Sequence, residues 1–185
     1  MHHFKIFMHP IQSLLSQINE QELWAEIIKL KRNAYLVRPG QLATNLYYVE
    51  SGSLRVGLLN AEEDHTIRFA YQGSFFGALD SFISETPTRY SIEALKSATL
   101  KSIKKVDFMR LVNGSSEQKS NWEVLLLELI KQQMEREVDL LTTSPQIRYE
   151  RLLERSPSVF QEIPHKYIAA YLRMKPETLS RIKKS

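Results

Sequence analysis

Hydrophobic positions divide the chain into an N-terminal helical stretch, a β-rich middle and a helical C-terminal half. Between residues 11 and 32, apolar side chains recur three or four residues apart, which is the spacing of one helix face. Asn19 followed by Glu22 is typical of a capping box, in which side chains bond the free N–H groups at a helix start. The pattern predicts a helix over residues 11–32, with an apolar face made by Leu23, Ile27 and Leu30.

The pattern changes over residues 33–104, where short runs of β-branched and aromatic residues alternate with turn residues. The segment LYYVESGSLRVGLL holds two such runs around residues 50–53, which indicates a hairpin. The run HTIRFAY alternates, with Ile67, Phe69 and Tyr71 on one face, and YSIEAL and ATLKSI follow as two more strands. Short strands separated by turns predict an antiparallel sandwich or barrel.

A short helix near residues 106–113 precedes a long one, which Ser115 and Gln118 can cap and which lasts to about Thr143. The long helix carries two apolar stripes, and Glu137 interrupts one of them. A helix that contacts only its own domain needs one stripe, so the second predicts a homodimer seam; the alternative is that both pack within one chain. The interrupted stripe holds Leu127, Ile130, Met134 and Leu141, and the other holds Trp122, Leu125, Leu126 and Leu129.

The C-terminal part begins with Ser144 and Pro145, an N-cap followed by proline at the first helical position, and PQIRYERLLER continues as a helix. A short helix over residues 165–172 is separated from the last helix by the break at residues 173–175. Pro176 opens that last helix. Two short helices joined by a tight turn predict a helix-turn-helix. The inward residues are Ile168, Ala169, Leu172, Leu179 and Ile182.

The outer side of the last helix carries residue types that bind base edges or phosphates in DNA complexes. Arginine bonds guanine, glutamate accepts from cytosine, and serine and lysine adapt to either kind of contact. The candidate DNA contacts are Lys175, Glu177, Thr178, Ser180, Arg181 and Lys184.

Charge is concentrated at the same end of the chain. Residues 145–185 hold nine Lys and Arg against four Asp and Glu, whereas the rest of the chain holds 16 against 17. A basic end on a near-neutral body indicates a polyanionic partner such as duplex DNA.

Composition excludes several kinds of chemistry. The 185 residues include no cysteine, which excludes disulfides, thiolate zinc sites and cysteine-bound iron–sulfur clusters. The five histidines are scattered, and no nucleophile, phosphate-loop or metal motif is present, so we expect no metal, no cofactor and no enzyme activity. No apolar run is long enough to span a membrane or to act as a secretion signal, so the expected compartment is the cytoplasm, with no membrane partner.

The segments VRPGQLATNLYYVESGSLRV, GSFFGAL and IPHKYIAAYLRMKPETLSRI resemble the Crp/Fnr family of bacterial transcription regulators, and the resemblance runs from about residue 20 to 185. It implies an α+β protein of three parts. These are a cyclic-nucleotide-binding-like β-roll (a double-stranded β-helix or jelly roll) with flanking helices over 1–114, a dimerisation helix over 115–143, and a helix-turn-helix DNA-binding domain over 144–185. The last part is short and ends at the recognition helix.

Two departures from the family pattern concern its nucleotide site. In members that bind cyclic AMP, a glutamate takes the ribose hydroxyl and an arginine neutralises the phosphate; here those positions are Ala78 and Thr88. Arg89 lies one residue later, which in a strand turns the side chain to the other face; the alternative is that the loop shifts by one residue and Arg89 reaches the pocket. The effector is therefore unknown, and we expect it not to be cyclic AMP. The candidate pocket residues are Phe76, Gly77, Ala78, Leu79, Thr88, Arg89 and Tyr90.

The helix-turn-helix departs from the family as well. Arg173 stands where the family usually has glycine in the turn, and Lys175 stands where it has a serine or threonine cap. A non-glycine residue in the left-handed conformation costs about 1–2 kcal/mol, and a lost cap costs about 1 kcal/mol.

Two functions follow from these patterns. The first is a transcription regulator that binds an inverted repeat in duplex DNA as a homodimer, with RNA polymerase as a further candidate partner. The alternative is a cyclic-nucleotide-type sensor domain that acts through protein contacts and has a weakened DNA-binding unit. The polar face of the last helix favours the first, because a protein-contact module would not need it.

Overall fold

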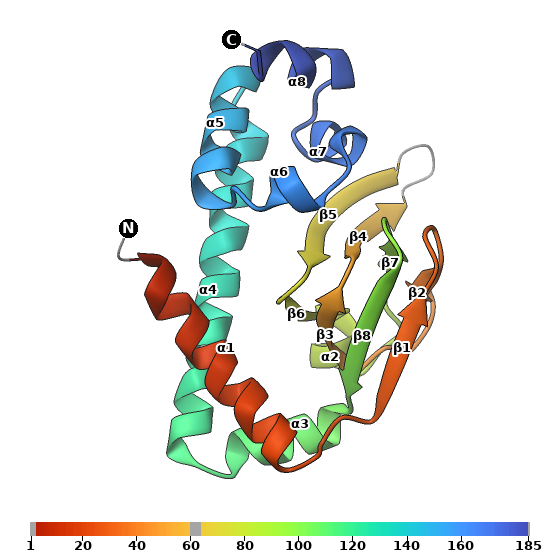
Figure 1. The fold of residues 1–185 in the computed structure, drawn as a ribbon, viewed down its shortest axis with the longest axis vertical. Helices are drawn as coiled ribbons and strands as arrows, with labels where there is room; N and C mark the ends of the chain where they lie inside the picture. Colours follow the sequence, from red (N-terminus) through yellow and green to blue (C-terminus); the bar gives the residue numbers. More distant parts are fainter. Residues whose placement is uncertain (1–2, 60–63, 185) are drawn as a thin grey trace.

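The computed structural model describes residues 3–59 and 64–184 (Figure 1). Its β-rich part is a roll of two four-stranded antiparallel sheets, with strand orders β1-β8-β3-β6 and β2-β7-β4-β5. The predicted fold class is confirmed. The strands are β1 Glu26–Leu30, β2 Tyr35–Val37, β3 Leu46–Ser51, β4 Ser53–Leu59, β5 Asp64–Tyr71, β6 Phe75–Gly77, β7 Ser91–Ala94 and β8 Ala98–Ile103.

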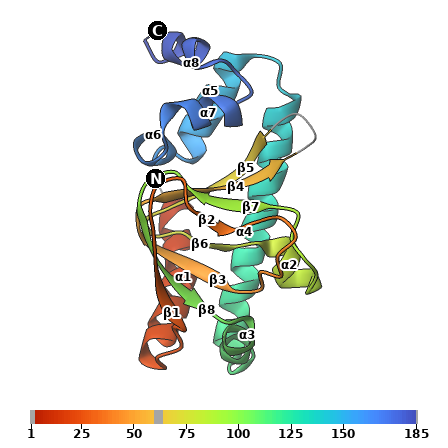
Figure 2. The same cartoon turned by 90° about the vertical axis from the view of Figure 1, so that its right-hand side faces the viewer.

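The inner faces of the two sheets enclose one hydrophobic core. Val49, Leu54, Ile92 and Leu100 are completely buried there, and each comes from a different strand. The short helix α2 (Leu79–Ser84) connects β6 to β7 and lies at the edge of the roll, where Phe82 is buried (Figure 2). Alternating burial along short strands is therefore what the β-rich pattern encoded.

The hairpin predicted around residues 50–53 is wrong. Strand β3 pairs with β6 and β8, whereas β4 pairs with β5 and β7, so the chain passes between the sheets at Gly52. Gly52 has φ of 85°, and a Cβ on it would lie 2.2 Å from the carbonyl oxygen of Ser97. A turn between two strands needs the same residue types whether they pair or change sheets, so the local pattern could not distinguish these outcomes.

The N-terminal helix is displaced from its predicted position. Helix α1 covers His3–Glu20, and the prediction of helix over residues 11–32 is wrong beyond residue 20 because residues 26–30 pair with β8. Ile28 and Leu30 pack on the core, whereas Ile27 is 62% exposed. In so short a segment, apolar residues spaced two apart, as in a strand, cannot be distinguished from apolar residues spaced three apart, as in a helix. Pairing with β8 decided that the segment is a strand.

The predicted capping box is wrong for the same reason. Asn19 lies near the end of α1, and its Oδ1 accepts a hydrogen bond of 2.7 Å from the indole Nε1 of Trp24. Glu22 has φ of 53°, which is the left-handed conformation typical just after a helix. The two residues therefore mark a helix end.

The two helices predicted after the roll are confirmed. Helix α3 covers Lys105–Asn113, and α4 covers Ser116–Leu141, where the Ser115 Oγ accepts from the Gln118 backbone N–H at 3.1 Å. Helix α4 runs beside α1 and along the roll (Figures 1 and 2). Near its start the Trp122 ring lies 5.1 Å from Phe108, which ties the long helix to α3.

The C-terminal unit packs at the far end of α4, next to β5 (Figure 1). Ser144 caps its first helix, as predicted, since its Oγ accepts from the Ile147 N–H at 3.4 Å. Phe69 and Tyr71 lie on one face of β5, as predicted, and pack on this unit; the Phe69 ring lies 5.2 Å from that of Tyr171. The helices are α5 Pro145–Arg155, α6 Val159–Glu162, α7 His165–Tyr171 and α8 Pro176–Ile182.

Candidate functional site

Helices α7 and α8 form the predicted helix-turn-helix. Ile168, Ala169, Leu172 and Leu179 are buried at their junction, and Ile182 is partly buried beside them. The turn is closed by a hydrogen bond of 3.0 Å from the Met174 N–H to the Ala169 carbonyl. The apolar spacing of the two helices therefore encoded both elements and the sides on which they pack together.

The two unusual residues of the turn adopt the geometry that the family pattern requires. Arg173 has φ of 53°, which is the left-handed conformation that glycine takes at no steric cost. Lys175 is the N-cap of α8, and its side chain makes no capping hydrogen bond. Both features remove stability from the turn, and another interaction must hold it in place.

Arg148 supplies that interaction. Its side chain is buried and donates to four backbone carbonyls, two just after α4 and two at the turn between α7 and α8. The acceptors Thr142 and Thr143 follow α4, at 2.6 and 3.0 Å, and the acceptors Leu172 and Arg173 lie in the turn, at 2.8 and 3.2 Å. Sequence patterns did not identify Arg148, because its charged side chain on an amphipathic helix is typical of a solvent-exposed face.

A second buried group fixes the direction of α5 against α4. The Asp139 side chain is 0% exposed and accepts from Arg151 Nε at 2.9 Å and from Arg155. Burial alone would raise the pKa of Asp139, but hydrogen bonds from Arg155 and Arg151 outweigh it and hold the pKa below its ordinary value. Glu135 extends the network with a bond of 2.6 Å from Arg151.

The six candidate DNA contacts lie together at the tip of the molecule. Leu179 is completely buried, so the opposite side of α8 is turned outward. On that side and at the two ends of α8, Lys175, Glu177, Ser180, Arg181 and Lys184 are exposed, and Thr178 is partly buried. The structure thus brings the six residues to one surface beside the basic C-terminal end.

The second candidate region is the loop that would hold a cyclic phosphate. Thr88 is 2% exposed, and its Oγ1 donates to both carboxylate oxygens of Asp80, at 2.8 and 3.0 Å. The Arg89 backbone N–H also donates to Asp80, at 3.1 Å. A carboxylate therefore accepts hydrogen bonds at the position where the family resemblance places the arginine that neutralises the phosphate.

The arginine of this loop is turned to solvent. The Arg89 side chain is exposed, and Tyr90 is partly buried against the core; both precede β7 (Ser91–Ala94), so the strand alternation used in the sequence prediction does not apply to them. Ala78 is buried and is the N-cap of α2, without a side chain that could bond a ribose hydroxyl. The loop keeps the backbone of a nucleotide site and lacks both of its charged anchors.

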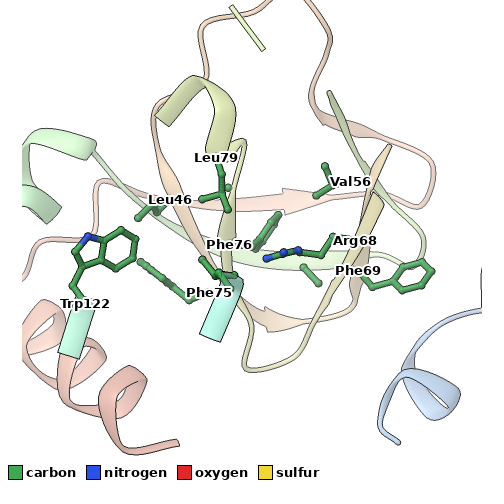
Figure 3. Close-up of a pocket in the computed structure, with 11 residues that line it drawn as sticks. Leu46, Val56, Arg68, Phe69, Phe75, Phe76, Leu79 and Trp122 are labelled. Carbon is green, nitrogen blue, oxygen red and sulfur yellow. The ribbon is translucent and has the colours of Figure 1, made fainter. Parts of the chain in front are cut away.

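A cavity of about 40 Å³ opens on the α4 side of the roll (Figure 3). Three of the seven candidate pocket residues, Phe76, Gly77 and Leu79, line it. Ala78, Thr88, Arg89 and Tyr90 are not among its lining residues, so the structure separates the predicted set into a cavity and a neighbouring loop.

The sequence prediction missed Arg68 and Trp122 at this cavity. Figure 3 shows the Arg68 side chain extending into the cavity beside Phe76, with Trp122 on the opposite side. Because Phe69 and Tyr71 face outward, the alternation of β5 places Arg68 on the inner face. A charged residue in the inward stripe was the signal that could have identified it.

One stripe of α4 is packed and the other is exposed. Trp122 and Leu125 pack on the cluster around Phe108, and Leu129 lines the cavity. The other stripe is exposed to solvent on the described chain: the exposed fractions are 64% for Leu127, 56% for Ile130, 62% for Met134 and 84% for Leu141.

Comparisons with known proteins agree with this architecture. Residues 27–115 match the cyclic nucleotide-binding domain family. A CooA mutant from Carboxydothermus hydrogenoformans superposes with a TM-score of 0.70 at 18% identity, over 92% of this chain and 82% of that chain. FixK2 from Bradyrhizobium japonicum gives 0.69 at 16% identity, over 86% and 82%. The regulator CLP from Xanthomonas campestris gives 0.63 at 17%, over 91% and 90%. A search of curated protein sequences found no significant match.

The fold and the matched domain define a cyclic nucleotide-binding-type domain joined to a helix-turn-helix unit. The chain has the fold of the Crp/Fnr transcription regulators, and the resemblance predicted from its sequence is confirmed. Within the described residues, no helix combines the length and apolar character needed to cross a membrane.

We predict that Asp139→Asn lowers the free energy of unfolding at pH 7 by about 3 kcal/mol, because it leaves two guanidinium groups beside a neutral amide. The pKa of Asp139 is depressed in the folded state from an ordinary value of 3.8, so its contribution is present above that value and is lost as the pH falls. Urea unfolding from pH 7 to pH 3 should therefore show the two proteins converging on acidification.

Glu135→Gln is the matched control, because it removes the more exposed carboxylate that bonds Arg151. Glu135→Gln should lower the free energy of unfolding by less than about 1 kcal/mol. Equal losses for the two variants, or a difference between wild type and Asp139→Asn that does not shrink with acid, would contradict the role given to Asp139.

Proposed function

We propose that this chain is a DNA-binding transcription regulator that acts as a homodimer, with the β-roll as its effector-sensing domain. The observation that carries the proposal is the outward face of α8, which presents Glu177, Ser180 and Arg181 on a helix-turn-helix held by the buried Arg148. A polar face of this composition fits the major groove, where arginine reads guanine and glutamate accepts from cytosine. We assign residues 1–114 to sensing, 115–143 to dimerisation and 144–185 to DNA binding.

The dimer proposal rests on the exposed stripe of α4. Its large apolar side chains repeat along one side of a 26-residue helix. A row of exposed apolar side chains of this kind is unusual on the surface of a monomer. A second copy packed in parallel would cover the stripe and would place two α8 helices on one side of the assembly. Two-fold symmetry of the protein then requires an inverted repeat in the DNA.

The first prediction concerns base recognition by Arg181. Arg181→Ala should reduce discrimination between a specific and a mutated site by about 1–3 kcal/mol, because a bidentate contact to one base pair is lost. Lys184→Ala should weaken binding to all sequences more evenly and lower the dependence on salt. Fluorescence anisotropy with a selected DNA site measures both. An unchanged sequence preference in Arg181→Ala would show that another residue reads the base.

The second prediction concerns the α4 seam. Replacing Ile130 and Met134 together by aspartate should give monomers that lose specific DNA binding, because like charges would face each other in an apolar interface. Ile83→Asp is the control, since Ile83 is 73% exposed on α2, away from the stripe. Light scattering at micromolar concentration gives the mass. A monomeric wild type, or a dimeric double variant, would contradict the seam.

The third prediction is that cyclic AMP is not the effector. A charge-assisted hydrogen bond contributes about 1.5–3 kcal/mol, so the absence of both family anchors weakens binding by about a hundredfold or more. The Asp80 carboxylate adds repulsion, because it already accepts from Thr88 and the Arg89 N–H. Titration calorimetry with cyclic AMP and cyclic GMP should detect no micromolar binding. Saturable binding that disappears in Arg89→Ala would show that the loop shifts and accepts the phosphate.

Action through protein contacts is the second candidate function. The left-handed Arg173 and the uncapped start of α8 favour it, because both weaken the helix-turn-helix. A wild-type dimer without any salt-dependent affinity for duplex DNA would support this function over the first.

A further inference from the structure

A larger cleft of about 280 Å³ lies next to the cavity beside Trp122, between β5, α4 and the C-terminal helices. Residues from all three parts of the molecule line the cleft, including Tyr171 of α7 and Gln132 of α4. The two hollows are neighbours, and six residues line both: Arg68, Phe69, Phe75, Phe76, Trp122 and Leu129.

Arg68 brings a positive charge into this space without a partner. It forms no ion pair and no hydrogen bond with any residue that the structure describes, although it is partly buried. Burial lowers the pKa of its guanidinium, and an electrostatic interaction with Tyr171 only partly offsets that effect. Figure 3 shows Phe76 beside the guanidinium, whereas Phe69 points the other way. A cation in such a position is far more stable with an anion than alone.

Arg136 brings a second positive charge to the same cleft from α4. Its Nη2 donates to the Tyr171 carbonyl at 2.6 Å, and the guanidinium lies 3.7 Å from the centre of the Tyr171 ring. Its Nη1 is buried and has no hydrogen-bond partner among the described residues, and burial lowers the pKa of the group. Arg136 therefore has a donor left to offer.

The other charged groups of the cleft do not neutralise this pair. Arg155 lines the cleft, but it is already paired with the buried Asp139. Glu128 is the one carboxylate among the described lining residues, and it forms no ion pair with Arg68 or Arg136. Among the described residues, Arg68 and Arg136 form no ion pair, and the cleft walls around them are mostly apolar and aromatic. Asp139 interacts electrostatically with Arg136, but its hydrogen bonds go to Arg151 and Arg155.

We propose that this cleft is the effector site, and that its ligand is a small organic carboxylate with an aromatic or apolar body, not a cyclic nucleotide, held by Arg68 and Arg136. The inference rests on the proposed function, since an effector has meaning only for a regulator. A carboxylate can accept from both arginines, and its apolar body can pack on Phe75, Phe76 and Trp122. Such a ligand would contact β5, α4 and α7 at once.

The site explains how binding could be transmitted. Arg68 belongs to the roll, Arg136 to the long helix, and the backbone carbonyl that Arg136 bonds belongs to the last residue of α7. A ligand that binds both arginines would move α4 and α7 relative to β5, and would therefore change how the helix-turn-helix packs against the roll. Coupling of this kind requires a ligand that binds the two arrangements with different affinity.

Calorimetry on the full chain with benzoate and its neutral isostere benzamide tests the site. Benzoate should bind saturably and at least about tenfold more tightly than benzamide, because only the anion satisfies the two arginines. Arg68→Met should abolish the preference for the anion, and Arg136→Met should reduce it. Arg89→Met is the matched control, since Arg89 is exposed and lies outside the cleft; it should bind like the wild type.

Thermal unfolding separates a functional arginine from a structural one. Arg68→Met should leave the melting temperature unchanged or raise it, because an unpaired and partly desolvated cation is replaced by an apolar side chain of similar length. A clear fall in melting temperature would show that Arg68 supports the fold, and would overturn the proposal. Inorganic phosphate is a further arm: phosphate binding as tight as that of benzoate would show a simple anion site without a role for the apolar walls, and would also overturn it.

The effector role is read from DNA affinity. Saturating benzoate should change the affinity of the wild type for a selected site by about fivefold or more, in either direction, and should leave Arg68→Met unaffected. No binding of benzoate up to about 10 mM, or binding that leaves DNA affinity unchanged, would overturn the inference while the DNA-binding function stands. A wild type that binds benzoate but no DNA would overturn the proposed function instead.

Discussion

The presentation of the last helix depends on one buried side chain, Arg148. Four backbone carbonyls, two after the long helix and two at the helix-turn-helix turn, would each lose a buried or partly buried hydrogen bond if this guanidinium were absent. Because its donors lie in one plane with fixed directions, Arg148 sets the spacing between the end of α4 and the turn. It also stabilises a turn in which Arg173 adopts a conformation that favours glycine.

The Asp139 network makes the same connection rigid from the other side. Through Asp139, Arg151 and Arg155 tie α5 to the second half of the long helix. The roll packs on the C-terminal unit through the buried Leu95, the Phe69–Tyr171 ring pair and Arg55, whose guanidinium lies 5.4 Å from the centre of the Tyr167 ring. The cleft lies at this boundary, where a ligand can change the arrangement of the two parts.

Local patterns along the chain predicted the elements better than their pairing. The helix-turn-helix, the long helix and its cap at Ser115 follow from side chains close in sequence, and all are present. The crossing at Gly52 and the strand over residues 26–30 depend on partners such as β8, which lie about 70 residues away for β1 and are invisible to a local pattern. The roles of Arg68, Arg148 and Asp139 were missed because a charged residue in an amphipathic segment has the same pattern whether it faces water or a buried partner.

Selection of bound duplexes from a random DNA pool by the purified protein tests the central claim most directly. The account predicts enrichment of an inverted repeat whose half-sites are centred about 34 Å apart, because two α8 helices related by a two-fold axis must enter successive major grooves. Enrichment of a single half-site, or recovery of the pool without any sequence preference at moderate salt, would contradict it.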